Sequence, residues 1–302
     1  MENLLLHSLV FIFIITLTIK FLLERRKQER KLPPSPPAIP IIGHLHLLKQ
    51  PLHRTFHSLS QKYGPIVSVK LGSRLAIVVS SPSLVEECFT KNDIVFANRP
   101  FFSNSRYLTY NHSTMGAAPY GDHWRNLRRI GSIEIFSPSR INMFVDVRKD
   151  EVKRLVRRLY HVCNKGFAKV KLRPMFMDLS FNVIMRMVAG KRYYGEELEQ
   201  VEEGRRFREI MTEFVQCTEV SDPADIFPIL KVFGFKGAEE KCMRVGKRLD
   251  EFLQGLIDRH RSKKDGNTMI NRMLDLQQSQ PEYYTEEIIK GLIQVNASNR
   301  IG

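Results

Sequence analysis

A run of 20 mostly apolar residues near its start, from Leu4 to Leu23, limits how this chain can be arranged. As a helix, such a run is long enough to cross a hydrocarbon layer of ~30 Å. A cleaved signal peptide carries positive charge before its apolar run, whereas here Glu2 precedes the run and the basic segment 24–31 follows it. We therefore predict a retained transmembrane anchor over residues 1–23.

The segment after the apolar run predicts an orientation and a spacer. Basic residues beside an anchor stay in the cytosol, so segment 24–31 places Met1 in the lumen. We expect a single-pass protein of the endoplasmic reticulum membrane whose body faces the cytosol. Residues 33–40 contain five prolines, which fix φ and favour a stiff extended chain. Residues 24–40 are thus predicted to be a basic stop and spacer, with an ordinary Pro-rich linker or SH3 ligand as the alternative.

Hydrophobic spacing in the body predicts a mainly α-helical fold with one small β-hairpin. Alternating apolar residues over 67–71, a Gly-Ser turn and a β-branched run over 75–79 indicate the hairpin. Apolar residues at helical spacing indicate helices elsewhere. The expected helices are 51–62, 82–91, 122–131, 141–163, 177–189, 198–217, 237–262, 269–277 and one beginning near Thr285.

The segment from Asp225 to Phe235 is unusually apolar for a connection between helices. Apolar aromatic segments pack into a core or lie on a membrane surface. Both readings stay open for this segment.

Composition excludes several classes of function. The net charge of +15 suits nucleic acid, anionic lipid or an acidic protein, but no motif that reads RNA or DNA accompanies it, so no nucleic-acid partner is expected. No phosphate-binding loop or hydrolase constellation is found, and no catalytic residue is assigned. The four cysteines show no CxxC or zinc spacing, so we expect reduced thiols and no metal ligands: Cys88, Cys163, Cys217 and Cys242.

The stretch from Gly116 to Ile130 carries the most chemical information. Trp124 and Arg128 are four residues apart, so on a helix the indole N–H and the guanidinium share one face and can bind a buried carboxylate. Arg125 and Arg129 form a second stripe beside them. From the residues alone, a basic surface helix with one core tryptophan is the favoured alternative, because charge runs are usually solvated.

These residues belong to a longer pattern that resembles the plant microsomal cytochromes P450, the haem-thiolate monooxygenases, and most closely the isoflavone 2'-hydroxylase group. The pattern runs in order through nearly the whole chain, as PPSPPAIPIIGHLHLL, QKYGPIVSVKLGSR, FANRP, APYGDHWRNLRRI and YYTEEIIKGLI. The resemblance implies that Trp124 and Arg128 hold a haem propionate. It also implies that Arg125 and Arg129 face an NADPH-dependent cytochrome P450 reductase.

The resemblance also implies a substrate pocket and an activity. The pocket would be lined by the loop from Phe101 to Ala118 and the helix around Phe214, with Phe101, Phe102, Met115 and Phe214 as candidates. The implied reaction is hydroxylation of a small plant phenolic such as an isoflavonoid, with O2 and reductase-delivered electrons.

The resemblance stops before the family's haem-ligand loop. That loop holds a cysteine thiolate on the iron, and none of the four cysteines here lies in a Gly- and Arg-containing loop near the C-terminus. The family's acid-Thr and Glu-Arg pairs are also absent. After Ile293 the chain reads QVNASNRIG, whose polar residues are not expected to be buried. We assign 41–293 to the N-terminal portion of a cytochrome P450 domain and 294–302 to a divergent tail.

These features predict a truncated or alternatively spliced product, or a faulty gene model, that binds haem weakly or not at all and is inactive alone. The alternative is a non-catalytic, membrane-anchored interaction protein that competes with intact enzymes for the reductase.

Overall fold

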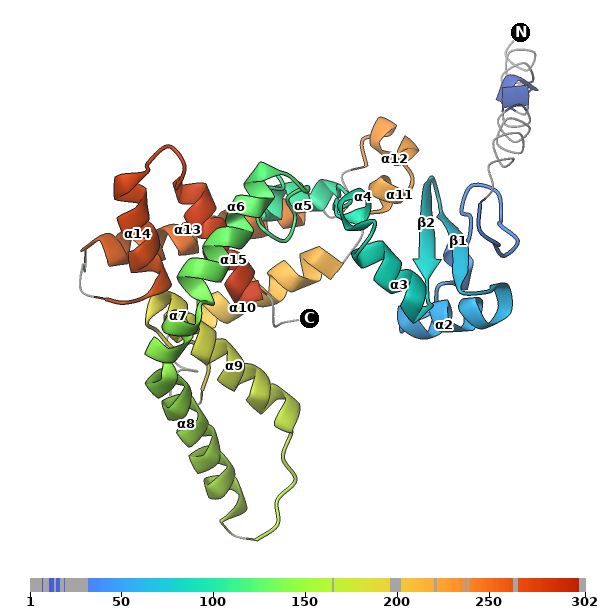
Figure 1. Cartoon of the computed structure of the whole chain (residues 1–302). Coiled ribbons are helices and arrows are strands. Elements are labelled where there is room, and N and C mark those ends of the chain that lie inside the picture. Colours follow the sequence, from blue (N-terminus) through green and yellow to red (C-terminus); the bar gives the residue numbers. More distant parts are fainter. Residues whose placement is uncertain are drawn as a thin grey trace. The chain divides into compact units, whose positions relative to one another are not determined.

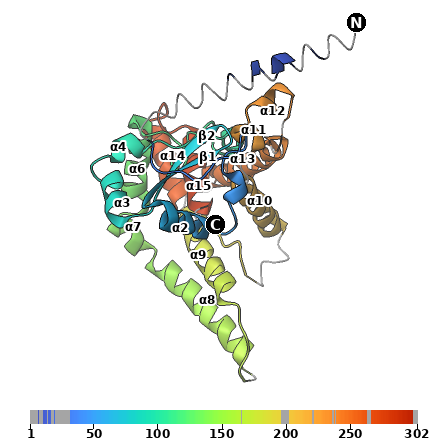
Figure 2. The same ribbon diagram turned by 90° about the vertical axis from the view of Figure 1, so that its right-hand side faces the viewer.

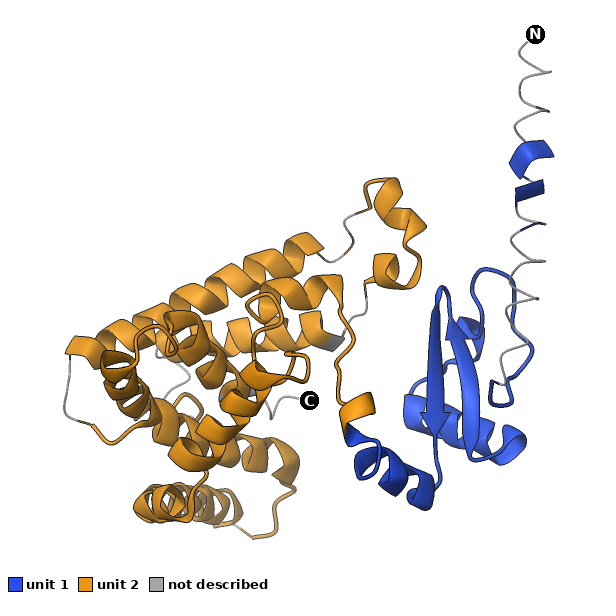
Figure 3. Cartoon of the chain, turned by 45° about the horizontal axis from the view of Figure 1, so that its top comes forward, with its two compact units in different colours: residues 1–93 blue, residues 94–302 orange. Residues whose placement is uncertain are grey.

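The computed structural model forms two compact units, residues 1–93 and residues 94–302 (Figure 3). It describes residues 32–164, 166–195, 202–219, 222–235, 237, 239–262 and 266–298, with scattered positions between His7 and Ile19. The predicted anchor therefore lies mostly outside the described residues. Among the residues that are described, no helix is both long and apolar enough to cross a membrane.

The first unit is built on an antiparallel hairpin, as predicted. Strand β1 (Ile66–Leu71) pairs with β2 (Arg74–Val79) through a tight turn at Gly72. The short helix η1 (Leu45–Leu47) and the helices α2 (Leu52–Tyr63) and α3 (Pro82–Phe89) accompany the hairpin (Figure 1). Helix α2 ends before Gly64, whose φ of 106° favours glycine because it has no Cβ.

The Pro-rich segment lies along the outer edge of β1. The Ser68 N–H donates to the Pro34 carbonyl at 2.9 Å, and the His44 N–H donates to the Lys70 carbonyl at 2.7 Å. His44 Nδ1 also accepts the Lys70 N–H at 2.7 Å. The described part of the predicted spacer is thus docked on the sheet, where it satisfies backbone groups that an edge strand would otherwise leave unpaired.

In the second unit, every regular element among the described residues is a helix. Short helices near its start are α4 (Asp93–Phe96), α5 (Ser103–Leu108), α6 (Asp122–Ile130), the π-helical turn η2 (Gly131–Ile135) and α7 (Pro138–Met143). The remaining helices are α8 (Val145–Cys163), α9 (Leu172–Ala189), α10 (Glu202–Glu219), α11 (Pro223–Ile226), α12 (Ile229–Val232), α13 (Glu239–Ser262), α14 (Met269–Ser279) and α15 (Glu286–Ser298). The mainly helical fold with one hairpin is therefore confirmed.

One predicted helix, 141–163, is wrong as a single element. The structure breaks it at Phe144, whose φ and ψ of −99° and 19° leave the helical region. Arg148 Nη1 donates to the Ile141 carbonyl at 2.6 Å and so satisfies a group that the break exposes. Helices α4, α5, α11 and α12 were missed, because four to six residues are too few to show a 3.6-residue period.

The core of the second unit is formed by apolar faces of α6, α9, α10, α13, α14 and α15. Phe207 lies at its centre, with its ring centroid 4.7 Å from Tyr193, 4.8 Å from Phe252 and 5.5 Å from Phe181. Such aromatic pairs contribute roughly 0.5–1.5 kcal/mol each beyond the apolar area that they bury. The predicted stripe on α13 is buried as expected: Leu249, Phe252, Leu253, Leu256 and Ile257.

Helix α15 corrects the expectation that the residues after Ile293 would not be buried. Gln294, Val295 and Ala297 are all buried, with 3%, 8% and 2% of their surface exposed. Gln294 Nε2 donates to the Leu108 carbonyl at 2.6 Å, and this bond offsets part of the cost of burying the amide. The Oε1 atom of Gln294 is buried without a hydrogen-bond partner among the described residues. The domain boundary at residue 294 stays a prediction.

The apolar segment from Asp225 to Phe235 forms α11, α12 and the residues after them. Asp225 is buried, but Ile229, Val232, Phe233 and Phe235 are exposed. These four side chains therefore do not pack into the core.

Candidate functional site

Helix α6 presents one apolar face and one basic face. Leu127 and Ile130 are buried, while Arg125, Arg128 and Arg129 are exposed. Asp122 lies in the first turn and two arginines lie in the last turn, which places each charge at the end of the helix dipole that stabilises it.

Trp124 and Arg128 share one face of α6, as their spacing predicts. The guanidinium carbon of Arg128 lies 5.6 Å from the centre of the Trp124 ring, within reach of a cation–π interaction. The indole N–H donates to the Met115 carbonyl at 3.1 Å. Arg128 has no hydrogen-bond or ion-pair partner among the described residues. Of the two predicted propionate donors, only Arg128 has N–H groups available for an anion.

The other two arginines of the basic face have local partners. Arg125 forms an ion pair with Asp122 one turn earlier, and Arg129 donates from Nη2 to Asn126 Oδ1 at 2.8 Å. Both side chains remain exposed. Their predicted contact with a reductase stays a prediction.

The four candidate pocket residues differ in exposure. Phe101 and Phe102 are exposed, and Phe101 packs edge-on against His112 with ring centroids 4.8 Å apart. Met115 packs against the core of the second unit, and Phe214 is buried within it. Their shared role as a pocket lining therefore stays a prediction.

Sequence reasoning missed how the loop of candidate pocket residues, 101–118, is fastened. The Ser103 N–H and hydroxyl both donate to Asp225, at 2.8 and 2.6 Å. The Tyr107 hydroxyl donates to Glu239 Oε1 at 2.5 Å. Bonds to charged acceptors are shorter and stronger than bonds between neutral groups. The loop is thus held to α11 and α13.

Tyr110 makes a third contact that holds this segment, and its acceptor also binds a lysine of α15. The Tyr110 hydroxyl donates to Asp250 Oδ1 at 2.9 Å, and Lys290 Nζ donates to the same oxygen at 2.7 Å. Burial raises the pKa of Tyr110, and the negative charge of Asp250 raises it further. Ser103 and Tyr107 are four residues apart on α5, so their hydroxyls share one face of that helix, which is the signal that could have indicated their contacts. Tyr110 lies beyond the end of α5, with a φ of 48°, and no local spacing indicates its contact.

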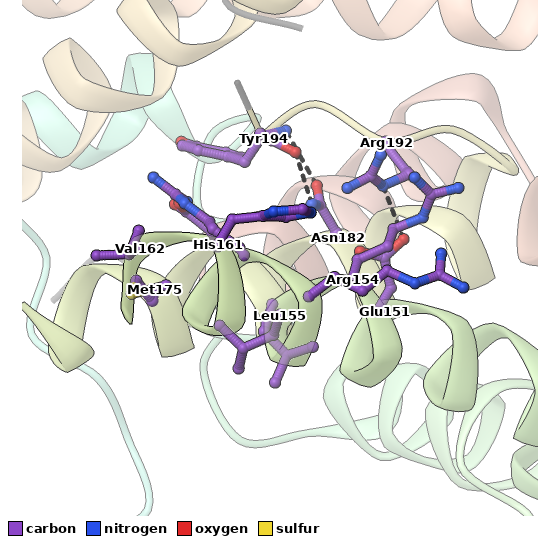
Figure 4. Close-up of a pocket in the computed structure, with 14 residues that line it drawn as sticks. Glu151, Arg154, Leu155, His161, Val162, Met175, Asn182, Arg192 and Tyr194 are labelled. Carbon is purple, nitrogen blue, oxygen red and sulfur yellow. Dashed lines mark hydrogen bonds and ion pairs between the residues drawn. The ribbon is translucent and has the colours of Figure 1, made fainter. Parts of the chain in front are cut away.

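A cavity of about 470 Å³ lies elsewhere, in the groove between α8 and α9 (Figure 4). Figures 1 and 2 show these two helices projecting as an antiparallel pair from the other helices of the second unit. Glu151, only 2% exposed, contacts Arg186 Nη1 and Arg192 Nε, each at 2.8 Å. A buried carboxylate needs such partners, because burying a charge alone is very costly.

Asn182 closes one wall of this cavity. Its Oδ1 accepts the backbone N–H of Tyr193 at 3.1 Å. Its Oδ1 also accepts the backbone N–H of Tyr194 at 3.0 Å, and its Nδ2 donates to the Tyr194 carbonyl at 2.8 Å (Figure 4). These bonds satisfy the amide and fix the backbone after α9. The polar groups that meet at this cavity stabilise the fold, and no reaction is assigned to them.

The fold and the basic helix agree with one family of proteins. The sequence profile of the family described as Cytochrome P450 matches residues 33–295. The chain belongs to the cytochrome P450 family.

Two relatives from Medicago truncatula are similar over almost the whole chain. Cytochrome P450 81E8 is 52% identical over 293 residues, and isoflavone 3'-hydroxylase is 51% identical over 297 residues; each match covers 96% of this chain. An isoflavone 2'-hydroxylase from the same plant is 48% identical and covers 91% of this chain. The resemblance to the isoflavone hydroxylases is confirmed. This chain spans only 59%, 59% and 57% of the three relatives, respectively.

The family implies haem, and the described residues fit only part of its needs. Arg128 offers a cation without an anionic partner, which suits a propionate. The axial position needs a cysteine thiolate in a loop. Here Cys217 and Cys242 are buried in helices, Cys88 lies within α3, and Cys163 ends α8. The described residues thus fit a propionate but place no cysteine in a loop that suits the iron.

Proposed function

We propose that this chain is the N-terminal portion of a plant cytochrome P450 monooxygenase that hydroxylates a small phenolic such as an isoflavonoid. Support for this substrate class comes from relatives named isoflavone 3'- and 2'-hydroxylases, at 51% and 48% identity. The reaction would use O2 and electrons passed from NADPH through a reductase. When bound, haem supplies the iron that activates the oxygen.

The observation that carries the haem part of this proposal is the Arg128 guanidinium on the Trp124 ring, which has no ion-pair partner among the residues that the structure describes. A planar guanidinium binds a carboxylate through two parallel N–H···O bonds. Arg128 would bind one propionate, and the indole would hold the guanidinium in place. Met115 would fix the indole, because its carbonyl accepts the indole N–H.

The 302-residue chain by itself would bind haem weakly and would not catalyse the hydroxylation. None of its four cysteines lies in a loop that could present a thiolate to iron. One arginine–propionate contact cannot replace the bond between a cysteine thiolate and the iron.

The cofactor proposal is tested by titrating the purified chain with hemin. We expect weak binding, no reduced-CO band of thiolate haem, and several-fold weaker binding for Arg128→Ala than for the control Arg129→Ala. A thiolate band from the unmodified chain would overturn the inactivity, and equal binding by both variants would overturn the role of Arg128.

The substrate class is tested with a chimera. Residues 1–293 are joined to the C-terminal part of the isoflavone 2'-hydroxylase from Medicago truncatula and expressed in microsomes with a reductase. NADPH-dependent hydroxylation of an isoflavone is the expected result. A chimera that gives the reduced-CO band but converts neither isoflavones nor other plant phenolics would contradict the proposal.

The membrane is the proposed location of the protein. An apolar run at residues 4–23 and the exposed side chains of Ile229, Val232, Phe233 and Phe235 support this. The endoplasmic reticulum, with the body facing the cytosol, follows from the basic segment after the run.

A reductase is the proposed protein partner, and Arg125 and Arg129 are the residues proposed to face it. Their exposure also supports the second candidate function, in which the chain competes with intact enzymes for the reductase. Added to microsomes, the chain should then lower the turnover of a resident cytochrome P450, and excess reductase should restore it. The same inhibition by an Arg125→Ala/Arg129→Ala variant would show that this face is not the contact.

A further inference from the structure

Two cysteines that the proposed function does not use lie together in the core of the second unit. Cys217 is in the last turn of α10 and Cys242 is in the first turn of α13. Their exposed fractions are 4% and 0%. Cys217 is also close enough to Cys242 to raise the pKa of its thiol.

The pairing of α10 with α13 independently places these two residues opposite each other. Four polar contacts join the helices in antiparallel order: Glu203 with Arg259, Arg206 with Glu251, Glu213 with Arg248, and Gln216 with Lys241. The next position on each helix is a cysteine. Each cysteine is adjacent to one member of the Gln216–Lys241 pair and is buried, so Cys217 and Cys242 lie at nearly the same level of the two antiparallel helices.

The spacing of packed helices suits a disulfide at this position. Helix axes pack roughly 8–10 Å apart and Cα atoms lie about 2.3 Å from their axis, so facing Cα atoms are roughly 3.5–5.5 Å apart. A disulfide needs about 4.4–6.8 Å between Cα atoms. The small size of the two cysteine side chains allows the helices to approach this closely here.

We propose that Cys217 and Cys242 are an oxidation site that forms a reversible disulfide, fastening the end of α10 to the start of α13. This inference is independent of the proposed function, because it concerns a covalent bond and not turnover.

Hydrogen peroxide is the oxidant that we assign to the reaction. One cysteine sulfur attacks a peroxide oxygen, the O–O bond breaks, and a sulfenic acid and one water form. The second sulfur then attacks the sulfenic sulfur, the S–S bond forms, and the hydroxyl leaves with a proton as the second water. Two thiols lose two electrons in total, and one peroxide gains them.

The position of the pair makes this oxidation slow but possible. Burial raises the pKa of Cys242 to about 12, and the neighbouring Cys217 adds to the shift. The reactive thiolate is therefore scarce at neutral pH. Both cysteines lie in terminal turns, where helices open most readily. The pair should react more slowly than the exposed Cys163.

The disulfide is tested on the full 302-residue chain treated with hydrogen peroxide, by peptide mapping without reduction. Trypsin releases Cys217 in peptide 209–231 and Cys242 in peptide 242–244. We expect these two peptides to be joined, with the mass of both less two hydrogen atoms, and to separate after dithiothreitol. The melting temperature should rise by roughly 5–10 °C on oxidation.

Matched variants separate this pair from the other two cysteines. A Cys88→Ser/Cys163→Ser variant should keep the joined peptides and the rise in melting temperature, whereas Cys217→Ala and Cys242→Ala should each lose both. The map of the unmodified chain remains decisive if an alanine variant does not fold. Cys217 and Cys242 found unjoined after Cys163 is fully oxidised, or joined to other cysteines, would overturn the proposal.

Discussion

Ser103 and Asp225, 122 residues apart in the chain, are joined by two hydrogen bonds from one residue to one carboxylate. The Ser103 N–H and hydroxyl donate at 2.8 and 2.6 Å, and Lys231 Nζ lies 3.4 Å from Asp225 Oδ1. Burial alone would raise the pKa of Asp225, but the bonds from Ser103 and the charge of Lys231 outweigh it and hold this pKa below its usual value. The ionised carboxylate is thus the form that fastens the start of loop 101–118.

Replacing Asp225 by asparagine should destabilise the second unit in a pH-dependent way. The loss should be about 1.5–3 kcal/mol at pH 7, because two charge-assisted bonds are weakened. A lowered folded-state pKa contributes stability above the unfolded pKa of about 3.9, which is lost as pH falls through the folded pKa. Urea unfolding from pH 7 to pH 3 should show the difference shrinking toward zero. The exposed Asp275→Asn is the control, and a difference that grows at low pH would contradict this account.

Replacing Tyr110 by phenylalanine should cost roughly 1–2 kcal/mol, because Asp250 loses a buried donor while it keeps Lys290. A raised tyrosine pKa adds stability that is complete below the unfolded value of about 10 and is lost at higher pH. The penalty, measured by urea unfolding, should therefore fall between pH 9 and pH 11. Tyr160→Phe on α8, where the ring is 65% exposed, should change stability little. Equal effects of the two substitutions would rule out the buried bond as the cause.

Two glycines of α13 should respond oppositely to alanine. A Cβ at Gly246 would lie 2.4 Å from the Tyr107 carbonyl oxygen, so Gly246→Ala should destabilise by about 1–3 kcal/mol through forced separation of α5 and α13. A Cβ at Gly255 meets nothing within 4 Å, so Gly255→Ala should stabilise by roughly 0.5–1 kcal/mol. Thermal unfolding checks both signs. A stable Gly246→Ala variant would show that α5 does not approach α13 this closely.

Charge introduced into the exposed apolar segment should weaken membrane association. Val232 and Phe233 are 83% and 80% exposed, and a Val232→Asp/Phe233→Asp variant would remove apolar contact and repel anionic lipid. In flotation with vesicles of phosphatidylcholine and phosphatidylserine, its bound fraction should fall several-fold. The control is Tyr160→Asp, which also exposes a charge at an apolar surface position. Equal binding by the segment variant and the unmodified chain would exclude this segment as a lipid contact.

Local spacing predicted much of this fold. Alternating apolar residues indicated β1 and β2, and the stripe at Leu249, Phe252 and Leu256 indicated the buried face of α13. The four-residue spacing of Trp124 and Arg128 placed both on one face of α6. These features follow from φ/ψ preferences and side-chain direction within one segment, so the sequence carries them directly.

The contacts that fasten the candidate site could not be read from the sequence in this way. Nothing in the local pattern pairs Ser103 with Asp225 or Tyr110 with Asp250, because each pair is more than 100 residues apart. Gln294 reads as a surface residue, yet it is buried because the Leu108 carbonyl from a distant helix accepts its amide. The indole N–H of Trp124 was expected to donate to a propionate, but it donates to the Met115 carbonyl.

The sequence by itself determined most of the long helices, the hairpin, the basic face of α6 and the family of this protein, because each is encoded by residues near one another in the chain or by their order. Only the tertiary structure decided which polar groups are satisfied, which apolar segment stays exposed, and which two cysteines meet. Those outcomes depend on distances across the core, where a buried polar group is stable only if packing brings a partner to it.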